Sequence, residues 1–166
     1  MALHEQSAGA TSEWYTPAHV FEAMATRFRW DPCMARTTNR VPAEQWCDAG
    51  TTVNGLGQDW HGLVWLNPPF GARNGIVPWL EKFFEHGDGV ALVPDRTSAP
   101  WWQTYAARAD AILFVAPKLK FIGADGLPGR SPAQGTCLLA AGHRGVLALR
   151  NAAALGLILV PATGGG

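Results

Sequence analysis

The chain has 166 residues, 48% of them hydrophobic, and its 13 basic and 13 acidic residues give a formal net charge of zero. This length suits one domain, and no run approaches the roughly 18 to 20 apolar residues of a membrane span. The amino terminus does not resemble a secretion signal, because it has no basic region followed by an apolar one. Neutral charge neither proves nor excludes nucleic acid as a partner, so any phosphate-binding charge must be local.

Cysteine and histidine usage argues against a metal or disulfide framework. The three cysteines are an odd number and include no close pair, and the five histidines are scattered without metal spacing. This pattern indicates a reducing cytosol and predicts no metal site.

The amino-terminal part of the chain predicts a tail, a helix and a strand. Residues 1–11 are small and polar and are expected to be disordered. Thr16 and Pro17 then suit the cap and first turn of an amphipathic helix over 17–27. The stretch "FRWDP" is expected to form a short strand that ends at Asp31 and Pro32, since proline cannot donate to a ladder.

The remaining residues predict alternating strands and helices. Residues 33–58 show no sustained period, and we expect a short helix at about 42–47 followed by a loop. Short apolar strands alternating with helices favour an α/β fold with a mainly parallel sheet and helices on both faces. We expect one domain over 12–160 and a flexible tail over 161–166. Further strands are expected at 62–66, 89–94, 111–116, 119–122 and 136–141, and further helices at 76–86, 100–107 and 145–155.

The stretch "VWLNPPFG" places an amide, two prolines and a ring directly after a buried strand. The Asn67 side-chain oxygen and the Pro68 carbonyl can accept the two hydrogens of an exocyclic amino group, and Pro69 helps to fix the backbone. Phe70 can lie against the face of the heterocycle. Accepting both hydrogens makes the amino nitrogen nucleophilic toward a strong electrophile such as a methyl sulfonium. The alternative is a plain Pro-Pro turn in which Asn67 caps the next element.

A [D/N/S]-P-P-[Y/F/W] motif after a buried strand is typical of S-adenosylmethionine-dependent amino-methyltransferases. The longer pattern "EWYTP … FRWDP … GLGQDWHGLVWLNPPFG … WLEKFF … VALVPDRTSAPWW … AILFVAPKLKFIG … SPAQGTCLLA" resembles the phage-type DNA N6-adenine methyltransferase family. The resemblance covers about residues 13–141. It implies a three-layer Rossmann-like methyltransferase fold, S-adenosylmethionine as cofactor, and double-stranded DNA with a flipped adenine as substrate. It also implies a phage or prophage gene expressed in the bacterial cytoplasm, with DNA modification that counters restriction.

The resemblance also implies roles for individual residues. Phe70 replaces the commoner tyrosine, and "MARTTNR" replaces the usual glycine-rich loop after the Asp31 strand. Glu44 and Asp48 are both candidates for the acid that binds the cofactor ribose. The implied catalytic residues are Asn67, Pro68, Pro69 and Phe70; the implied cofactor residues are Tyr15, Thr16, Pro17, Asp31, Pro32, Asp59 and Trp60; and the implied DNA-binding residues are Arg96, Lys118, Lys120 and Arg130.

Two alternatives stay open on the sequence. The same motif serves methyltransferases that act on adenine in RNA or on glutamine in proteins, and the neutral charge does not separate these substrates. The missing glycine-rich loop is also compatible with a non-catalytic nucleotide- or DNA-binding module. For Arg96, a surface ion pair with Asp95 is an alternative to a role in binding DNA.

Overall fold

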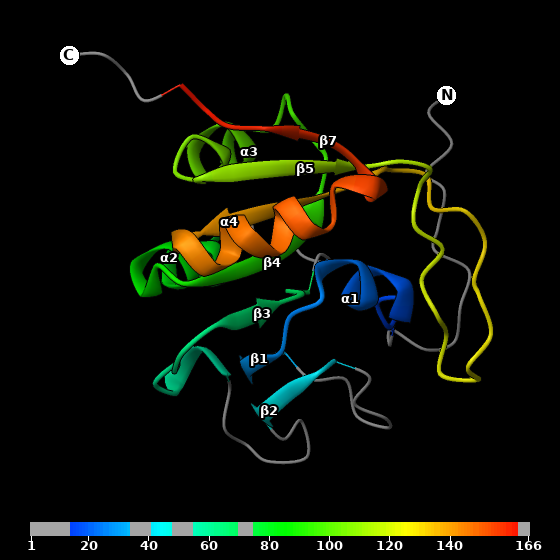
Figure 1. The fold of residues 1–166 in the computed structure, drawn as a ribbon, viewed down its shortest axis with the longest axis horizontal. Coiled ribbons are helices and arrows are strands. Elements are labelled where there is room, and N and C mark those ends of the chain that lie inside the picture. Colours follow the sequence, from blue (N-terminus) through cyan, green and yellow to red (C-terminus); the bar gives the residue numbers. More distant parts are fainter. Residues whose placement is uncertain (1–13, 34–40, 48–54, 70–74, 163–166) are drawn as a thin grey trace.

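The computed structural model describes residues 14–33, 41–47, 55–69 and 75–162, which form a sheet flanked by helices (Figure 1). The alternation of strands and helices confirms the predicted α/β class. In chain order the elements are α1 (Ala18–Met24), β1 (Phe28–Asp31), β2 (Ala43–Trp46), the 3-10 helix η1 (Gly55–Gly57), β3 (Val64–Leu66), α2 (Val77–His86), β4 (Gly89–Pro94), α3 (Pro100–Ala106), β5 (Ala111–Val115), β6 (Thr136–Ala141), α4 (Gly142–Asn151), the 3-10 helix η2 (Ala153–Leu155) and β7 (Gly156–Leu159).

One sheet joins the seven described strands in the order β2-β1-β3-β4-β6-β5-β7. β1 pairs in parallel with β2 and β3, and β3 pairs in parallel with β4. β6 is antiparallel to both β4 and β5, and β7 is antiparallel to β5. The strands β1 to β5 therefore share one direction, and β6 and β7 run against them. We call the end of the sheet where β1 to β5 finish, and where β6 begins, the carboxyl end of the sheet.

Hydrophobic side chains pack on both faces of this sheet. In β4, Val90 and Leu92 belong to a cluster that includes residues of α1 and α4, whereas Ala91 and Val93 belong to a cluster with residues of α2 and α3. Because successive side chains of a strand point to opposite faces, α1 and α4 cover one face and α2 and α3 cover the other. Every residue of β4 and β6 is buried, which explains their uninterrupted apolar sequences.

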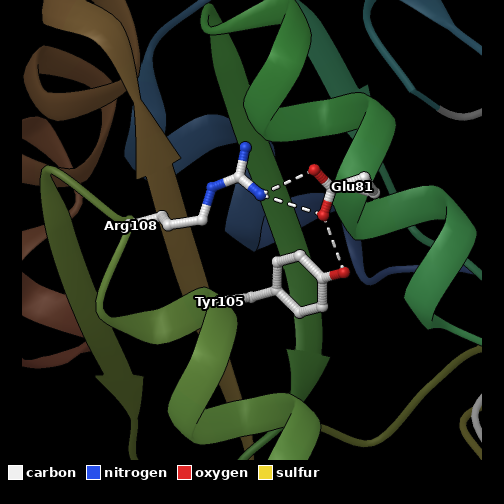
Figure 2. Close-up of polar contacts among 3 residues, drawn as sticks. All are labelled: Glu81, Tyr105 and Arg108. Carbon is white, nitrogen blue, oxygen red and sulfur yellow. Dashed lines mark hydrogen bonds and ion pairs between the residues drawn. The ribbon is translucent and has the colours of Figure 1, made fainter.

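A polar cluster of Glu81, Tyr105 and Arg108 joins α2 to the end of α3 (Figure 2). The Tyr105 hydroxyl donates to Glu81 at 2.9 Å, and the Arg108 guanidinium donates to both Glu81 carboxylate oxygens at 2.9 Å. The Arg108 guanidinium also lies 5.3 Å from the ring centroid of Phe84, which stacks on Tyr105. The Arg108 and Tyr105 hydrogen bonds lower the pKa of the Glu81 carboxyl, so this acid stays charged as the common partner of both groups.

The predicted helix at 42–47 is wrong, because residues Ala43–Trp46 form the strand β2. This stretch pairs in parallel with β1, with Phe28 opposite Ala43 and Trp30 opposite Gln45. β2 is an edge strand whose side chains are mostly exposed, so its sequence lacks the apolar pattern of the central strands. The backbone pairing with β1 outweighs the helix propensity of alanine, glutamate and glutamine.

The prediction also differs from the structure in two later segments. The expected strand at 119–122 does not form in the sheet; within it, Ile122 makes only isolated β-bridges, with Tyr15 and Pro128. The expected helix at 145–155 is instead α4, which begins at Gly142, followed by η2 and the unpredicted edge strand β7. The predicted tail at 1–11 and most of the tail at 161–166 lie outside the described residues.

Candidate active site at the carboxyl end of the sheet

The carboxyl end of the sheet gathers segments that are distant in sequence. Asp31 ends β1, Asn67 directly follows β3, and Arg96 follows β4. These three strands are neighbours, because β3 pairs with both β1 and β4. Residues 116–135, here called the excursion, leave β5 and return to β6 at the same end (Figure 1). Open parallel sheets bind ligands at this end, so the predicted donor, acceptor and DNA-binding segments share one region.

Asp31 is a buried carboxylate at the end of β1, with 3% of its surface exposed. Its Oδ1 accepts a hydrogen bond from the Cys33 backbone N–H at 3.1 Å. Burial raises the pKa of Asp31 to about 7, against the smaller opposing effect of that hydrogen bond. Among the described residues no cationic side chain offsets the Asp31 charge. A buried carboxylate without a counter-ion is unfavourable, and a cationic ligand group would relieve this cost.

Thr16 is buried beside the start of α1, with 4% of its surface exposed. Its Oγ1 has no hydrogen-bond partner within the described part of the chain. The prediction that Thr16 caps α1 is wrong, because Pro17 occupies the N-cap position and no side chain caps this helix. Tyr15 exchanges two backbone hydrogen bonds with Ile122 of the excursion, at 2.8 and 2.9 Å. The backbone next to this buried hydroxyl is thus held in place by the excursion.

Asp59 is exposed and lines an open pocket of about 580 Å³. Glu44, one of the two candidate ribose acids, lines the same pocket and also forms an ion pair with Arg29. The other candidate, Asp48, lies outside the described residues. The pocket thus brings together two acids predicted on separate segments. Its lining residues are Trp30, Glu44, Gln45, Trp46, Gln58, Asp59 and His61.

Most of that lining was not predicted from the sequence. Trp30 directly precedes Asp31 in β1, and this adjacency is the one sequence signal that pointed to it. Trp46 lies on β2, which the sequence pattern assigned to a helix. These tryptophans provide flat apolar surface next to the acidic side chains, a combination that suits an aromatic ligand with polar edges.

Trp60 is buried and does not line the pocket. Only 7% of its surface is exposed, and its indole N–H donates to the Gly55 carbonyl at 2.9 Å. Gly55 in turn lies against Pro32, since a Cβ added to Gly55 would be 2.1 Å from the Pro32 carbonyl oxygen. The segment that carries Asp59 therefore packs directly on the Asp31-Pro32 strand end, so the two predicted cofactor segments are in contact.

Asn67 and the two prolines follow β3, whose three residues are fully buried. Asn67 is half-buried, Pro68 is buried and Pro69 is exposed. The N-cap of α2 is Ile76, so Asn67 does not cap that helix as the alternative interpretation required. Within the described ranges the Asn67 amide makes no hydrogen bond, which leaves it available to a ligand. Phe70 lies outside the described residues.

The predicted DNA-binding residues lie on or beside the excursion. Arg96 is exposed and forms no ion pair with Asp95 in the described chain; instead Asp95 lies against Gly135, where an added Cβ would be 2.2 Å from Asp95 Oδ2. Lys118 donates to the Ala133 carbonyl at 2.9 Å and so ties the two arms of the excursion together. The side chains of Lys120 and Arg130 are exposed.

Among the described residues, neither a metal-binding cluster nor a membrane-spanning helix is present. No group of three or more histidine, cysteine, aspartate or glutamate side chains in 14–33, 41–47, 55–69 and 75–162 is placed to hold a metal ion. No helix in the same ranges has the length and apolar character needed to cross a membrane.

Comparison with known proteins identifies the family of the chain. Searches of curated proteins and of solved structures found no match. The family model of the DNA N-6-adenine-methyltransferases (Dam) matches residues 6–140, which is most of the chain and includes β1, β3, β4, β5 and nearly all of β6. This confirms the family resemblance carried by the sequence motifs. The chain therefore belongs to the DNA N-6-adenine-methyltransferase (Dam) family and is an adenine-specific DNA methyltransferase.

Proposed function

We propose that the chain transfers a methyl group from S-adenosylmethionine to N6 of an adenine flipped out of double-stranded DNA. The observation that carries this proposal is the pairing of β1 with β3, in which Trp30 lies opposite Val64. This register puts the Asp31 end of one strand beside the Asn67 end of the next. A carboxylate suited to a cationic donor and an amide suited to an amino acceptor thus lie on adjacent strands.

The residues at the end of β1 and before α1 fit the methionine end of the cofactor. Asp31 would accept hydrogen bonds from the ammonium group, which would offset its buried charge. The Thr16 hydroxyl, which has no partner within the described part of the chain, would donate to the carboxylate. Tyr15, Pro17 and Pro32 would hold this segment in place through the backbone. When bound, the cofactor supplies an electrophilic methyl group on a sulfonium sulfur.

The pocket beside β2 fits the adenosine end of the same cofactor. Asp59 would accept a hydrogen bond from the adenine amino group, and Glu44 would accept from the ribose hydroxyls. Trp30 and Trp46 supply aromatic surface for the purine, whereas Trp60 would act indirectly, through its hydrogen bond to the Gly55 carbonyl of the same segment. In this proposal, side chains would take the place of the glycine-rich backbone loop that the chain lacks.

Asn67 and the Pro68 carbonyl would hold the acceptor. By accepting the two amino hydrogens they draw the N6 lone pair out of conjugation and aim it at the methyl group. The cofactor held by Asp31 and Thr16 would supply the methyl group with its sulfur as the leaving atom, and N6 would release one proton to water. Phe70 would stack on the adenine, which must leave the duplex because its amino group is inaccessible there. Pro69 restricts the backbone at this point.

The excursion and Arg96 would contact the DNA backbone. The exposed cations Arg96, Lys120 and Arg130 lie on segments at the same end of the sheet as Asn67, and Lys118 shapes the excursion. Their contribution would be local, because the chain as a whole has no net charge. The biological setting that we propose is modification of phage or prophage DNA in the cytoplasm of a bacterial host, as protection from restriction.

The test is methyl transfer from labelled S-adenosylmethionine to duplex DNA, with RNA and protein as parallel acceptors. We expect label in N6-methyladenine of DNA alone. Asn67→Ala should abolish turnover while leaving the affinity for S-adenosylmethionine within about twofold, because Asn67 contacts only the acceptor. Asn151→Ala is the matched control, since Asn151 has no proposed contact with either substrate; its side-chain amide donates to the Met24 carbonyl at 3.0 Å. An Asn67→Ala enzyme with normal turnover would refute this role.

A further inference from the structure

Lys82 of α2 reaches across to the segment that carries Asp59. Its Nζ donates to the Leu56 carbonyl at 2.8 Å and to the Gln58 carbonyl at 2.6 Å. The same ammonium lies 5.4 Å from the ring centroid of Trp60, within the range of a cation–π contact. Two of the three ammonium N–H groups thus donate to backbone carbonyls, and the charge also lies near an aromatic ring. A half-buried lysine with these partners is an anchor rather than a solvated surface cation.

The segment that Lys82 contacts is also held at both of its ends. We call residues 55–62 the donor segment. At its start, Gly55 packs against the Pro32 carbonyl. At its end, the Gly62 carbonyl lies 2.7 Å from His86 Nε2, one helical turn along α2 from Lys82. Lys82 holds the middle of the donor segment through the carbonyls of Leu56 and Gln58, and Gln58 immediately precedes Asp59.

From this geometry we propose that Lys82 is a positioning residue for the cofactor, which acts by fixing the backbone under Asp59. This inference rests on the proposed function, in which Asp59 accepts from the adenine of S-adenosylmethionine. Lys82 itself does not line the pocket. The Gln58 carbonyl that it holds is bonded directly to the Asp59 amide, so the anchor lies one peptide from the residue that contacts the ligand. Lys82 thus ties the donor segment to the α2 helix.

The test is Lys82→Met, which removes the ammonium and keeps most of the apolar length. We expect the dissociation constant for S-adenosylmethionine, measured by calorimetry, to rise about tenfold or more, as the loss of hydrogen bonds from a charged donor predicts. The KM for the cofactor should rise more than kcat falls. The affinity for duplex DNA without cofactor should stay within twofold of wild type. Lys82→Arg should restore part of the cofactor affinity, because a guanidinium can donate to both carbonyls.

Arg108→Met is the matched control for the loss of a cation that anchors α2. Arg108 binds Glu81, the residue next to Lys82, and so joins α2 to α3 away from the donor segment (Figure 2). Removing it should lower the melting temperature without moving the dissociation constant for S-adenosylmethionine. An equal loss of cofactor affinity in both variants would overturn the proposal, since the effect of Lys82 would then be general destabilisation. Unchanged affinity in Lys82→Met would overturn it as well.

Hydrogen exchange separates this inference from the proposed function on which it rests. Lys82→Met should speed amide exchange in the donor segment while leaving α3 and β4 protected as in wild type. If the wild-type chain binds no S-adenosylmethionine, the proposed function fails by itself. Faster exchange confined to residues 55–62 would in that case still support Lys82 as the anchor of this segment, and unchanged exchange would refute it.

Discussion

Replacement of Asp31 by asparagine is expected to stabilise the ligand-free protein at neutral and alkaline pH. The substitution keeps the shape of the side chain and an acceptor for the Cys33 N–H, but it removes the buried charge. Burial raises the pKa of Asp31 from 3.8 to about 7. The folded state thus binds this proton more tightly than the unfolded state. Protonation of Asp31 therefore makes its full contribution to stability below pH 4, and this contribution is lost as the pH rises through 7. A difference of about three pKa units corresponds to about 4 kcal/mol, so at pH 8 the variant should be more stable by up to that amount.

The same charge is expected to favour cofactor binding, so the affinity for the cofactor should rise with pH while the stability of the ligand-free protein falls. An ammonium ligand requires ionised Asp31, and with a pKa of about 7 the ionised fraction rises from about 3% at pH 5.5 to about 50% at pH 7.0. The affinity of the wild-type chain for S-adenosylmethionine should therefore rise about 15-fold over this interval, in which the α-amino group of the ligand stays largely protonated. Asp31→Asn should bind more weakly at pH 7.0 and should show little dependence on pH.

Urea denaturation at pH 5 and pH 8 measures the first effect, and calorimetric titration at pH 5.5 and pH 7.0 measures the second. The two measurements are independent, because one uses the ligand-free protein. An Asp31→Asn chain that is less stable than wild type at pH 8 would contradict the assignment of an uncompensated buried charge. Wild-type affinity that does not change with pH would contradict the assignment of Asp31 as the partner of the ammonium group.

Three further substitutions test other parts of the site. Thr16→Val keeps the shape of the side chain but removes the buried hydroxyl, so calorimetry should show affinity for S-adenosylmethionine reduced about tenfold with no loss of thermal stability. Gly55→Ala should lower the free energy of unfolding in urea by about 1 to 3 kcal/mol, because its Cβ would meet the Pro32 carbonyl. Lys120→Ala combined with Arg130→Ala should weaken duplex binding for all sequences and should reduce the slope of log affinity against log salt by about two in fluorescence anisotropy. A salt dependence equal to that of wild type would exclude these two cations from the DNA contact.

The sequence by itself was sufficient for the family and for most of the central sheet. Strands such as β4 and β6 are buried on both faces, so their apolar runs are uninterrupted and are bounded by turn residues. Asn67-Pro68-Pro69 follows β3 without a gap, and its chemistry could be derived from the donor and acceptor capacity of three residues. The order of motifs along the chain then predicted the family that the comparison confirmed.

The edges of the sheet were predicted less well, for a physical reason. β2 and β7 each have one strand neighbour, and their side chains are largely or partly exposed, so neither carries the apolar pattern of a buried strand. What makes them strands is backbone pairing with β1 and β5, which depends on residues elsewhere in the chain. The pocket could not be predicted for the same reason, since Trp46 reaches it only because β2 pairs with β1.

The amino-acid sequence determined which chemical groups this enzyme has: an amide after a strand, a strand-end carboxylate, a threonine before a helix, and cations on one excursion. Only the tertiary structure decided the state of these groups. The ionised form of Asp31 is unfavourable because other segments bury it, and the Thr16 hydroxyl has no partner among the described residues because Pro17 takes the N-cap position. Lys82 becomes an anchor because α2 folds back onto residues 55–62. Burial and hydrogen-bond pairing are properties of neighbours in space, and they arise only when the chain has folded.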